Sequence, residues 1–500
     1  MSYYMGIDMG GTMVKAALFD ENGYEIKTCG RKLTVLYPGR DMAERSCGEA
    51  KNAVYGVIAD VLKETGISGA EVAGIGVTGQ ANGLYMLDAD GEPVQDAILS
   101  SDVRAKHYVT KWTGDGTWER ILPKIRQQIW AGNTPLLIRW MKDHRPEVLE
   151  KTRHLMTAKD YVRYLLTEDY CLEYTEASGI AMLDQQKRAF TTEITDAYGI
   201  TEYLDRFPKR ILESTEIGGV ISKKAAELTG LADGTPVVGG QMDTGASIIS
   251  TGITREDQLG IIVGSWGINS IVSNEAVVDP DIFMVYEYCL PGMYCVMEGS
   301  PTSATNQEWF IKRLTKDLDQ SNIYSECAKL VADADMRDTV FFLPFLYGSN
   351  VSVDAKAAFI GLTGSHGRAE MLRALYEGVA FCHQYHIEKL KRYAEHVNVI
   401  RMAGGAARSK VWMQMFSDIL GKPIEISQAS ELGAMGVAME AAVGTGYFKD
   451  MAEAAEKWVR IKNSYEPDPE KNAFYKEKYH VYKRILEQLQ PVWKEIDRLG

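Results

Sequence analysis

The sequence predicts an α/β protein of two domains, and three observations lead to this prediction. The chain has 500 residues, more than a single hydrophobic core usually serves, which favours two large domains. Apolar runs of strand length alternate with segments of helical periodicity, as in α/β folds. A weak internal repeat relates residues 5–17 to residues 259–271. Each copy reads as strand, glycine turn and strand, so we expect two domains built on one plan.

The first turn of the chain concentrates polar residues of a particular kind. Apolar residues lead into Asp8, which is followed by Gly10, Gly11, Thr12 and Lys15. Glycines let backbone N–H groups approach an anion closely, and a carboxylate beside such a cradle makes chemical sense when a cation such as Mg²⁺ lies between the two. The alternative is a plain β-hairpin whose glycines serve only the turn. The pattern alone leaves both interpretations open.

Composition and charge limit the classes of function. The chain is 45% apolar and 25% charged, with a net charge of −13 and a pI of about 5.3, which argues against general affinity for nucleic acid or for a membrane surface. Its seven cysteines are scattered and show no CxxC spacing, so neither a zinc site nor a disulfide framework is indicated. No segment has the pattern of a signal peptide or the length of a membrane span. We therefore expect a cytoplasmic protein.

The remaining first half continues the alternation of strands and helices. Asp102 and Arg104, two residues apart, share one face if their segment is extended. The predicted elements are, in order, a helix over 43–64 that stops near Gly66, strands over 72–77 and 84–87, a mainly helical region over 118–213 that contains an amphipathic helix at 158–165, and a polar loop at 175–178.

A second carboxylate stands at a glycine turn further along the chain. An apolar run ends in Gly239 and Gly240, and Asp243 follows. An Asp so placed is often a helix N-cap, and it could equally serve as a catalytic base, so both readings stay open. The predicted domains are residues 1–245, residues 246–455, and a charged helical extension over 456–500.

The second half contains another glycine turn between a strand and a helix. A strand over 398–403 runs into Gly404 and Gly405, and a helix over 409–420 follows. This arrangement is common in nucleotide-binding sites because a helix N-terminus favours phosphate, although an ordinary β–α connection has the same pattern. Residues 431–443 are rich in Ala and Gly and predict a helix whose small side chains serve close packing. The chain from residue 451 onward is predicted to be charged and helical.

In this order, these segments resemble the FGGY family of carbohydrate kinases from end to end. The resemblance implies a two-domain actin/hexokinase-like (ribonuclease H-like) fold with an interdomain cleft, and a kinase that uses ATP and Mg²⁺. The matching pieces are Gly6–Lys15, Gly76–Gly83, Asp102-x-Arg104, Lys159-Asp160-Tyr161, Gly239-Gly240-x-x-Asp243, Gly264-Ser265, Gly404-Gly405-Ala406 and a C-terminal signature at Ala357–Leu362 with Glu370 and Ala374–Glu377.

The same resemblance implies roles for individual residues. Asp8 would anchor Mg²⁺, and Asp243 would be the general base that accepts a proton from a sugar hydroxyl. The residues implied to hold the terminal phosphates are Gly10, Gly11, Thr12 and Lys15, and Gly264 and Ser265 would approach the phosphates from the second domain. Those implied to contact the nucleotide further are Ala304, Glu308, Gly404, Gly405 and Ser409, and those for the sugar are Gln80, Asn82, Asp102, Arg104 and Asn306.

Within the family, residues 98–102, 300–303 and 341–350 look most like the L-xylulose kinase branch, which favours a terminal hydroxyl of L-xylulose as acceptor. Three departures bear on specificity, because Ser100, Asn82 and Trp266 stand where family members often carry Trp, His and Thr. The alternatives are another pentulose (D-ribulose, D-xylulose or L-ribulose), a polyol or a sugar acid, and, in another class, a non-catalytic actin-like or sugar-sensing protein. Relatives are often dimers, so the resemblance also implies a possible homodimer.

Overall fold

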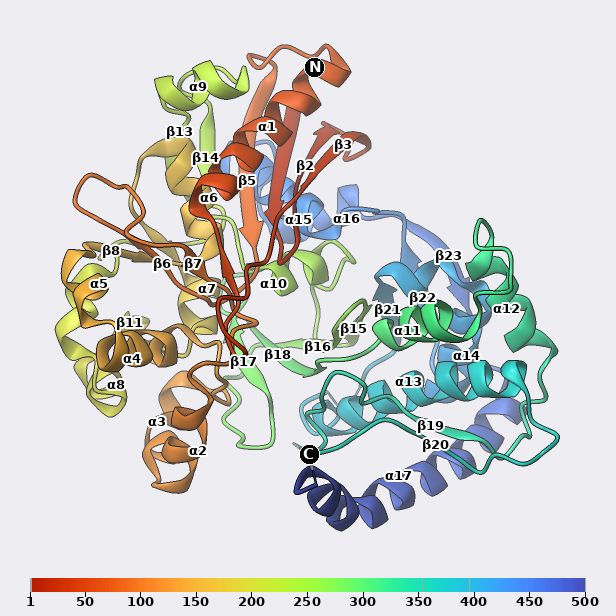
Figure 1. Cartoon of the computed structure of the whole chain (residues 1–500). Coiled ribbons are helices and arrows are strands. Elements are labelled where there is room, and N and C mark those ends of the chain that lie inside the picture. The colour runs from red at the N-terminus through yellow and green to blue at the C-terminus, as the bar shows by residue number, and fades with distance from the viewer. Residues whose placement is uncertain (1, 353, 395, 500) are drawn as a thin grey trace. The chain divides into compact units, whose positions relative to one another are not determined.

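The computed structural model describes residues 2–352, 354–394 and 396–499, which fold into two compact units. Unit 1 takes the ranges Met1–Thr254, Ser273–Val296 and Ala429–Arg460, and unit 2 takes Arg255–Val272, Met297–Gln428 and Ile461–Gly500. Each unit combines a sheet of mixed direction with helices (Figure 1), which confirms the predicted two-domain α/β architecture. These units interleave along the chain, whereas the predicted domains are contiguous, so the predicted boundaries stay a prediction.

The sheet of unit 1 is built around the first hairpin of the chain. Its strand order is β13-β14-β5-β1-β2-β3. Strand β1 (Tyr3–Met9) pairs antiparallel with β2 (Met13–Asp20) and parallel with β5 (Val72–Gly79). The predicted strand, glycine turn and strand are therefore confirmed, and Asp8 lies next to the end of β1.

Unit 2 repeats this arrangement with different strands. Strand β15 (Gln258–Val263) pairs antiparallel with β16 (Gly267–Ser273) and parallel with β21 (Val399–Ala403), and the order continues through β22 to β23. Both units thus contain a hairpin whose first strand has a parallel neighbour on its other side. This shared topology is the structural basis of the internal repeat seen in the sequence.

The other elements complete the two units. The remaining strands are β3 (Glu25–Lys32), β4 (Glu44–Arg45), β6 (Tyr85–Leu87), β7 (Ala97–Ile98), β8 (His154–Met156), β9 (Leu172–Glu173), β10 (Leu183–Asp184), β11 (Ala189–Phe190), β12 (Ile211–Leu212), β13 (Ile217–Val220), β14 (Pro236–Val238), β17 (Met284–Glu287), β18 (Tyr294–Ser300), β19 (Phe341–Leu343), β20 (Ala358–Ile360), β22 (Ile424–Ser427) and β23 (Ile461–Tyr465). The helices of the first half are α1 (Cys47–Thr65), α2 (Lys106–Gly114), α3 (Thr117–Ile125), α4 (Thr134–His144), α5 (Pro146–Lys151), α6 (Ala158–Thr167), α7 (Tyr174–Gly179), α8 (Thr192–Tyr198), η1 (Thr201–Arg206), α9 (Lys223–Thr229) and α10 (Asp243–Ile249). Those of the second half are α11 (Thr305–Leu314), α12 (Ile323–Asp333), α13 (Arg368–Leu390), η2 (Gly405–Arg408), α14 (Lys410–Leu420), α15 (Leu432–Gly444), α16 (Met451–Trp458) and α17 (Pro469–Asp497).

The two faces of β1 are covered by helices from distant parts of the sequence. Met5 and Ile7 belong to the apolar cluster that α1 fills, whereas Gly6 lies against α15, because a Cβ at Gly6 would collide with the backbone of Ala434. Side chains alternate along a strand, so Asp8 points to the same face as Gly6. The Ala- and Gly-rich α15 thus packs closely, as predicted, and its N-terminal end lies beside Asp8.

Close approach of α15 to a neighbouring helix depends on Gly436. A Cβ at this position would collide with the carbonyl oxygen of Ala246 in α10, and neither backbone can move freely. We expect Gly436→Ala to destabilise the protein by about 1–3 kcal/mol, although alanine is the better helix former. Thermal unfolding measures the effect. Gly114→Ala is the control, because nothing lies within 4 Å of its added methyl group; equal midpoints for the two variants would contradict the packing argument.

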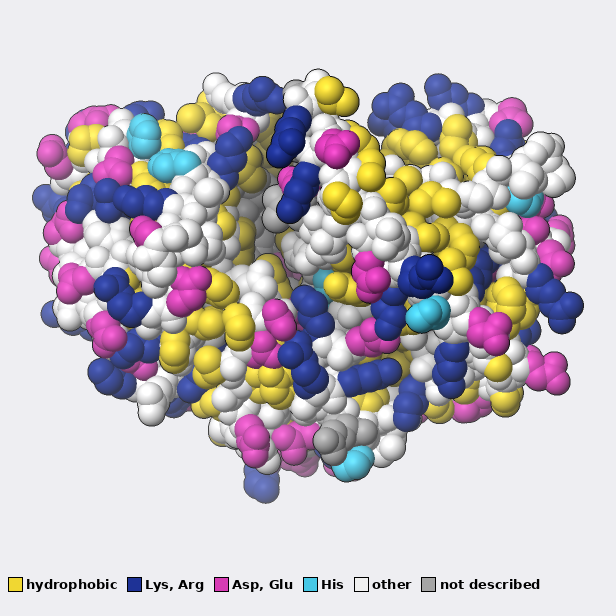
Figure 2. Space-filling model, turned by 90° about the horizontal axis from the view of Figure 1, so that it is seen from below, with side chains coloured by type: hydrophobic (Ala, Val, Ile, Leu, Met, Phe, Trp, Pro, Cys, Tyr) yellow, Lys and Arg dark blue, Asp and Glu magenta, His cyan; other side chains and the backbone are white. Residues whose placement is uncertain are grey.

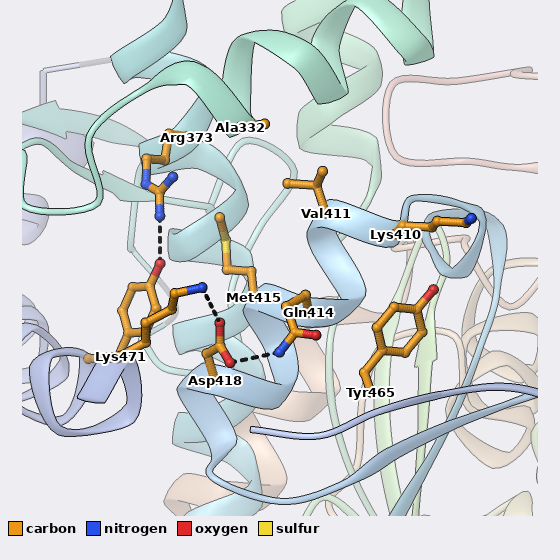
Figure 3. Close-up of a pocket in the computed structure, with 10 residues that line it drawn as sticks. Ala332, Arg373, Lys410, Val411, Gln414, Met415, Asp418, Tyr465 and Lys471 are labelled. Carbon is orange, nitrogen blue, oxygen red and sulfur yellow. Dashed lines mark hydrogen bonds and ion pairs between the residues drawn. The ribbon is translucent and has the colours of Figure 1, made fainter. Parts of the chain in front are cut away.

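In unit 2, the C-terminal helix is joined to α14 through Asp418 (Figure 3). Its carboxylate accepts hydrogen bonds from Gln414 Nε2 at 2.8 Å and from the backbone N–H of Asp468 at 2.9 Å, and the ammonium group of Lys471 lies 3.8 Å from it.

The chain from residue 451 is mostly helical, as predicted. The sequence analysis missed strand β23, which pairs antiparallel with β22 and so extends the sheet of unit 2.

A pocket of about 410 Å³ lies beside these residues in unit 2. Arg373 lines it and donates to the hydroxyl of Tyr475 at 2.9 Å and to Glu377 at 3.0 Å. Arg373 and Asp418 both have partners within the protein, so we interpret these charged groups as stabilising the contact between the helices. We assign no ligand to the pocket.

The surface mixes charges of both signs. On the face drawn in Figure 2, basic side chains lie among acidic and apolar ones, so neighbouring charges partly compensate one another and remain hydrated. Among the described residues, none of the helices combines the length and the apolar character that crossing a bilayer requires.

Candidate active site

Asp8 presents a carboxylate that the protein uses only in part. Its Oδ1 atom is buried and has no hydrogen-bond partner among the described residues. A Cβ at Gly433, near the N-terminus of α15, would lie 2.6 Å from its Oδ2 atom. Burial raises the pKa of Asp8 to about 6, opposed by the charge of Lys15 and assisted by that of Glu431. An unpartnered carboxylate oxygen in such a place is suited to a cation.

Lys15 lies opposite Asp8 in the hairpin and has a partner that the sequence did not suggest. The two residues form a cross-strand pair, so their side chains share one face. The ammonium group of Lys15 is 2.8 Å from Glu431 Oε2, and the two side chains are 36% and 23% exposed. An exposed pair of this kind is weak, so a phosphate could compete with Glu431 for the lysine.

Asp243 occupies the first position of α10 and is not its N-cap, which is Met242. Its Oδ1 atom accepts the N–H of Thr244 at 2.7 Å, and no other described residue donates to this carboxylate. The preceding Gly240 has φ 71°, and a Cβ there would collide with the carbonyl oxygen of Val77. The turn ahead of Asp243 therefore needs glycine, and the capping interpretation left open by the sequence is wrong.

The two acidic residues are electrostatically coupled within unit 1. Burial raises the pKa of Asp243 to about 7, with the charge of Asp8 as the next cause and the N–H of Thr244 opposing both. The geometry of the backbone agrees with this, because Asp8 pairs with Thr78 between β1 and β5, and the hydroxyl of Thr78 donates to Gln241 O at 2.7 Å, two residues before Asp243. The structure therefore brings the segments that carry Asp8 and Asp243 together from positions far apart in the sequence.

Arg45, which the sequence analysis did not select, binds the backbone of the turn at Gly10 and Gly11. It is fully buried, and its Nη2 atom donates to the carbonyl oxygens of Gly10 (3.1 Å) and Gly11. These two carbonyls are thereby turned toward the arginine, which leaves Gly11 and Thr12 exposed on the other side. The backbone of the proposed phosphate cradle is thus held in place by a cation.

Asp102 and Arg104 contact each other, although their segment is not a strand. Arg104 Nε lies 2.9 Å from both oxygens of Asp102, and its Nη2 lies 2.7 Å from Glu44 Oε1. Asp102 also accepts the N–H of Ala43 at 2.7 Å. Since residues 43 and 44 directly precede Arg45, this buried pair is connected to the glycine turn, and its arginine has no free charge to offer a substrate.

Gln80 and Asn82 follow β5 and differ in how much they offer a ligand. Gln80 Nε2 is buried without a partner among the described residues, and Gln80 Oε1 lies near Gly11. Asn82 has φ 62°, and its side chain donates to Gly179 O at 3.2 Å and accepts from Asn133 and Thr134 at 2.8 and 3.3 Å. Among the described residues, one amide N–H of Asn82 and both amide N–H groups of Gln80 are left without a partner.

Glu176 is a further carboxyl near Asp243 that the sequence analysis read as part of a polar loop. That interpretation is wrong, because the segment is helix α7. The Oε1 atom of Glu176 accepts the N–H of Asn82 at 3.0 Å. Burial raises the pKa of Glu176 to about 8; the charge of Lys159 lowers it, and Asp160 and Asp243 raise it further. Burial therefore favours the uncharged form of this carboxyl.

Helix α6 forms where the amphipathic helix was predicted, and its charged residues are buried. Lys159 and Arg163 lie 2.8 and 2.7 Å from the same oxygen of Asp160. All three side chains are at most 2% exposed. Charge pairing replaces hydration here, as buried charges require.

The nucleotide-side candidates lie in unit 2, where backbone contacts gather three of them. The N–H of Ser303 donates to Ser265 O at 3.1 Å, and that of Ala304 donates to Gly264 O at 2.9 Å. A Cβ at Gly404 would lie 2.5 Å from the carbonyl oxygen of Val263. The turn at Gly404 and Gly405 therefore lies beside the turn at Gly264 and Ser265.

The other candidates of unit 2 differ in what they offer. Ser409 caps α14 by accepting the N–H of Trp412 at 3.3 Å, and Gly405 begins the short helix η2. Asn306 is buried, donates to Ser303 O at 2.9 Å, and keeps an unpartnered Oδ1 among the described residues. Glu308 is exposed on α11.

The oxygen atoms around Asp8 are suited to Mg²⁺. They are too few for a metal ion whose ligands are all protein side chains. The described residues contain no group of three or more His, Cys, Asp or Glu side chains placed to hold a metal. Mg²⁺ commonly takes one or two carboxylates and completes its shell with water and phosphate oxygens. The free oxygen of Asp8 beside an exposed glycine turn meets that requirement.

Comparisons with known proteins identify the family. Residues 3–250 match the N-terminal domain of the FGGY family of carbohydrate kinases, and residues 259–445 match its C-terminal domain. The chain is 35% identical over 492 residues to the L-xylulose/3-keto-L-gulonate kinase of Escherichia coli (strain K12), covering 98% of this chain and 97% of that protein. It is 33% identical to a probable L-xylulose kinase of Pasteurella multocida (strain Pm70), covering 98% and 99%.

A solved structure agrees with these matches. The crystal structure of xylulose kinase from Rhodospirillum rubrum superposes with a TM-score of 0.90 at 25% identity, covering 98% of this chain and 100% of that one. Since both family domains and nearly the whole length of the relatives are matched, the chain belongs to the FGGY family of carbohydrate kinases and is an ATP-dependent sugar kinase.

Proposed function

We propose that this kinase transfers the γ-phosphoryl group of ATP to a terminal hydroxyl of a ketopentose, with L-xylulose as the favoured acceptor and Asp243 as general base. The observation that carries the proposal is the placement of two carboxylates, Asp8 and Asp243, on neighbouring segments of unit 1 that Thr78 joins. Asp8 is suited to hold the metal ion that binds the phosphates, and Asp243 is suited to accept the proton of the attacking hydroxyl. Phosphoryl transfer requires both of these groups.

On this proposal, Asp243 holds the proton of the attacking hydroxyl. The sugar oxygen loses that proton to the carboxylate while it bonds to the γ-phosphorus, and ADP leaves. A carboxyl whose pKa is raised to about 7 is a stronger base than an ordinary aspartate and still ionises near neutral pH, which is the range that general-base catalysis favours.

The phosphate end is assigned to the hairpin of unit 1. We propose that Gly10, Gly11, Thr12 and Lys15 bind the terminal phosphates, with Lys15 exchanging Glu431 for phosphate. Asp8 would hold Mg²⁺ through its free Oδ1 atom. When bound, Mg²⁺ neutralises charge on the phosphates. The other residues proposed to contact the nucleotide, including its phosphates, are Gly264, Ser265, Ala304, Glu308, Gly404, Gly405 and Ser409.

A neutral sugar fits the polar groups of unit 1 better than a sugar acid does. Arg104 is the obvious cation among the proposed sugar residues, and it is committed to Asp102 and Glu44. The amide group of Gln80, whose Nε2 has no partner within the described chain, is suited to a hydroxyl, and buried polar groups of this kind reject analogues that lack the matching group. We propose that Gln80, Asn82, Asp102, Arg104 and Asn306 contact or shape the sugar site.

A panel of acceptors tests the proposal. ADP release is measured with L-xylulose, D-xylulose, D-ribulose, L-ribulose, a pentitol and 3-keto-L-gulonate, at saturating ATP and Mg²⁺. We expect the highest kcat/KM for L-xylulose. A higher value for the sugar acid, which the name of one relative includes, would contradict the choice of a neutral substrate. ADP release that no acceptor stimulates would contradict the proposal as a whole.

A further inference from the structure

The backbone just before Asp243 is held by a threonine from another part of unit 1. The N–H of Met242, the N-cap residue of α10, donates to Thr175 Oγ1 at 2.9 Å. Thr175 is 1% exposed, so water does not compete for this bond. The peptide that carries Asp243 is thus attached to helix α7.

Thr175 is itself fixed by Glu173, the N-cap of α7. One oxygen of Glu173 accepts the hydroxyl of Thr175 at 2.8 Å, and the other accepts its N–H at 2.8 Å. The second oxygen also accepts the hydroxyl of Ser214 at 2.7 Å. A hydroxyl has a single hydrogen. Because Glu173 takes that hydrogen, Thr175 can meet Met242 only as an acceptor, which is the role that the N–H requires.

Other buried side chains hold the rest of this turn. Arg163 Nη1 donates to Gly239 O at 2.7 Å, and Thr78 Oγ1 donates to Gln241 O at 2.7 Å. Together with the bond from Met242, three of the four residues before Asp243 are attached by their backbone to side chains of α6, β5 and α7. These attachments leave Asp243 as the first residue after a segment that has little freedom to shift.

We propose that Thr175 is a positioning residue for phosphoryl transfer, whose hydroxyl, oriented by Glu173, sets the direction of the Asp243 carboxylate through the N–H of Met242. The inference rests on the role proposed above for Asp243. It assigns a purpose to the Tyr174–Gly179 helix that the family resemblance left without one.

The expected consequence is a loss in turnover more than in binding. Among the described residues, the side chain of Thr175 bonds to Glu173 and Met242, neither of which is proposed to bind phosphate or sugar, so ground-state binding should persist. A displaced base reacts less often, and a misplacement of about 1 Å can cost 10²-fold in rate. The predicted signature is therefore a fall in kcat at nearly constant KM.

The test compares three threonine variants. Thr175→Val keeps the shape and removes the acceptor, and Thr175→Ser restores it. Thr229→Val is the matched control, since Thr229 is 2% exposed, donates to Ala225 O at 2.6 Å and accepts the N–H of Leu231 at 3.3 Å, away from Asp243. For each, kcat and both KM values are measured with the acceptor that the wild type turns over best, together with the thermal unfolding midpoint.

We expect Thr175→Val to lower kcat by about 10- to 100-fold with both KM values within about threefold of wild type. Thr175→Ser should recover most of the rate, and Thr229→Val should lower the unfolding midpoint without lowering kcat. If Thr175→Val does not fold, Thr175→Ala is judged by the same criteria.

Unchanged kcat in the valine variant, or an equal loss in Thr229→Val, would overturn the inference. These failures differ from failure of the proposed function. If Asp243→Asn removes turnover while Thr175→Val does not, only the positioning role falls. If the wild type phosphorylates none of the acceptors, both fall together.

Discussion

Replacing Asp243 by asparagine is expected to lower kcat for sugar phosphorylation by about 10²–10⁴-fold, the usual contribution of a general base. Asparagine has nearly the same shape and can still accept the N–H of Thr244, which the wild-type carboxylate accepts at 2.7 Å. It cannot take a proton from the acceptor hydroxyl. The loss should therefore appear in turnover, while the affinity for nucleotide stays close to that of the wild type.

Two measurements separate these effects. Acceptor-dependent ADP release gives kcat, and calorimetric titration with Mg·ADP gives nucleotide affinity. Asp257→Asn serves as control, because Asp257 is paired with Arg255 in unit 2 and lies outside the proposed site. A variant at position 243 that keeps wild-type turnover would remove the base from the mechanism.

The pH dependence follows from the same carboxylate. Burial, and next the charge of Asp8, raise the pKa of Asp243 to about 7, so below that pH the folded enzyme holds the group protonated and unable to act as base. We expect kcat/KM for the acceptor to fall tenfold per pH unit below about pH 7 and to level off above it. In Asp243→Asn this dependence should be absent from the residual activity.

The second large effect is expected at Asp8. Asp8→Asn removes the negative charge and leaves an amide of similar size where Oδ1 is now unpartnered. Loss of one preorganised electrostatic group commonly costs about 10²–10³-fold in rate. We expect a fall of that size in kcat/KM for MgATP, and a higher Mg²⁺ concentration for half-maximal rate.

Activity measured over a range of Mg²⁺ concentrations checks this prediction. Asp60→Asn is a suitable control in the same unit, because Asp60 is a partly exposed residue paired with Arg31 at 2.8 Å. Asp8→Asn with the Mg²⁺ dependence of the wild type would show that this carboxylate does not hold the metal, even if its rate were low.

The parts of the site that could be predicted from the sequence are those whose signal is local. Asp8 stands at the end of an apolar strand just before a glycine turn, and Asp243 stands just after a strand and its glycine turn, so a short segment in each case contains both the backbone geometry and the chemical group. The same holds for α14, which was predicted over 409–420 and is found at Lys410–Leu420, between its N-cap Ser409 and its C-cap Gly421.

Contacts between distant segments could not be predicted in this way. Glu431 pairs with Lys15 across 416 positions, and neither residue has a local pattern that indicates the other. Likewise, the periodicity of residues 158–165 could not show that Lys159 and Asp160 would be buried together, because a charged helical face is normally exposed. The wrong loop assignment at 175–178 arose because polar residues on a short buried helix resemble a turn.

The fold shows the same division between local and distant information. Single helices and strands such as α1, β5 and α14 could be located closely from periodicity and end signals. The return of residues 429–460 to unit 1 depends on Gly6, Gly76 and Gly436, whose missing side chains let α15 approach the sheet and α10. A glycine indicates that something can come close, and only the tertiary structure shows what does.

The most direct test of the account is a crystal structure of the protein with ADP, Mg²⁺ and L-xylulose bound. We predict a metal ion next to the carboxylate of Asp8 and a terminal sugar hydroxyl within hydrogen-bonding distance of Asp243. A sugar bound with its hydroxyl groups away from Asp243, or a metal ion held without Asp8, would contradict the division of labour between the two residues.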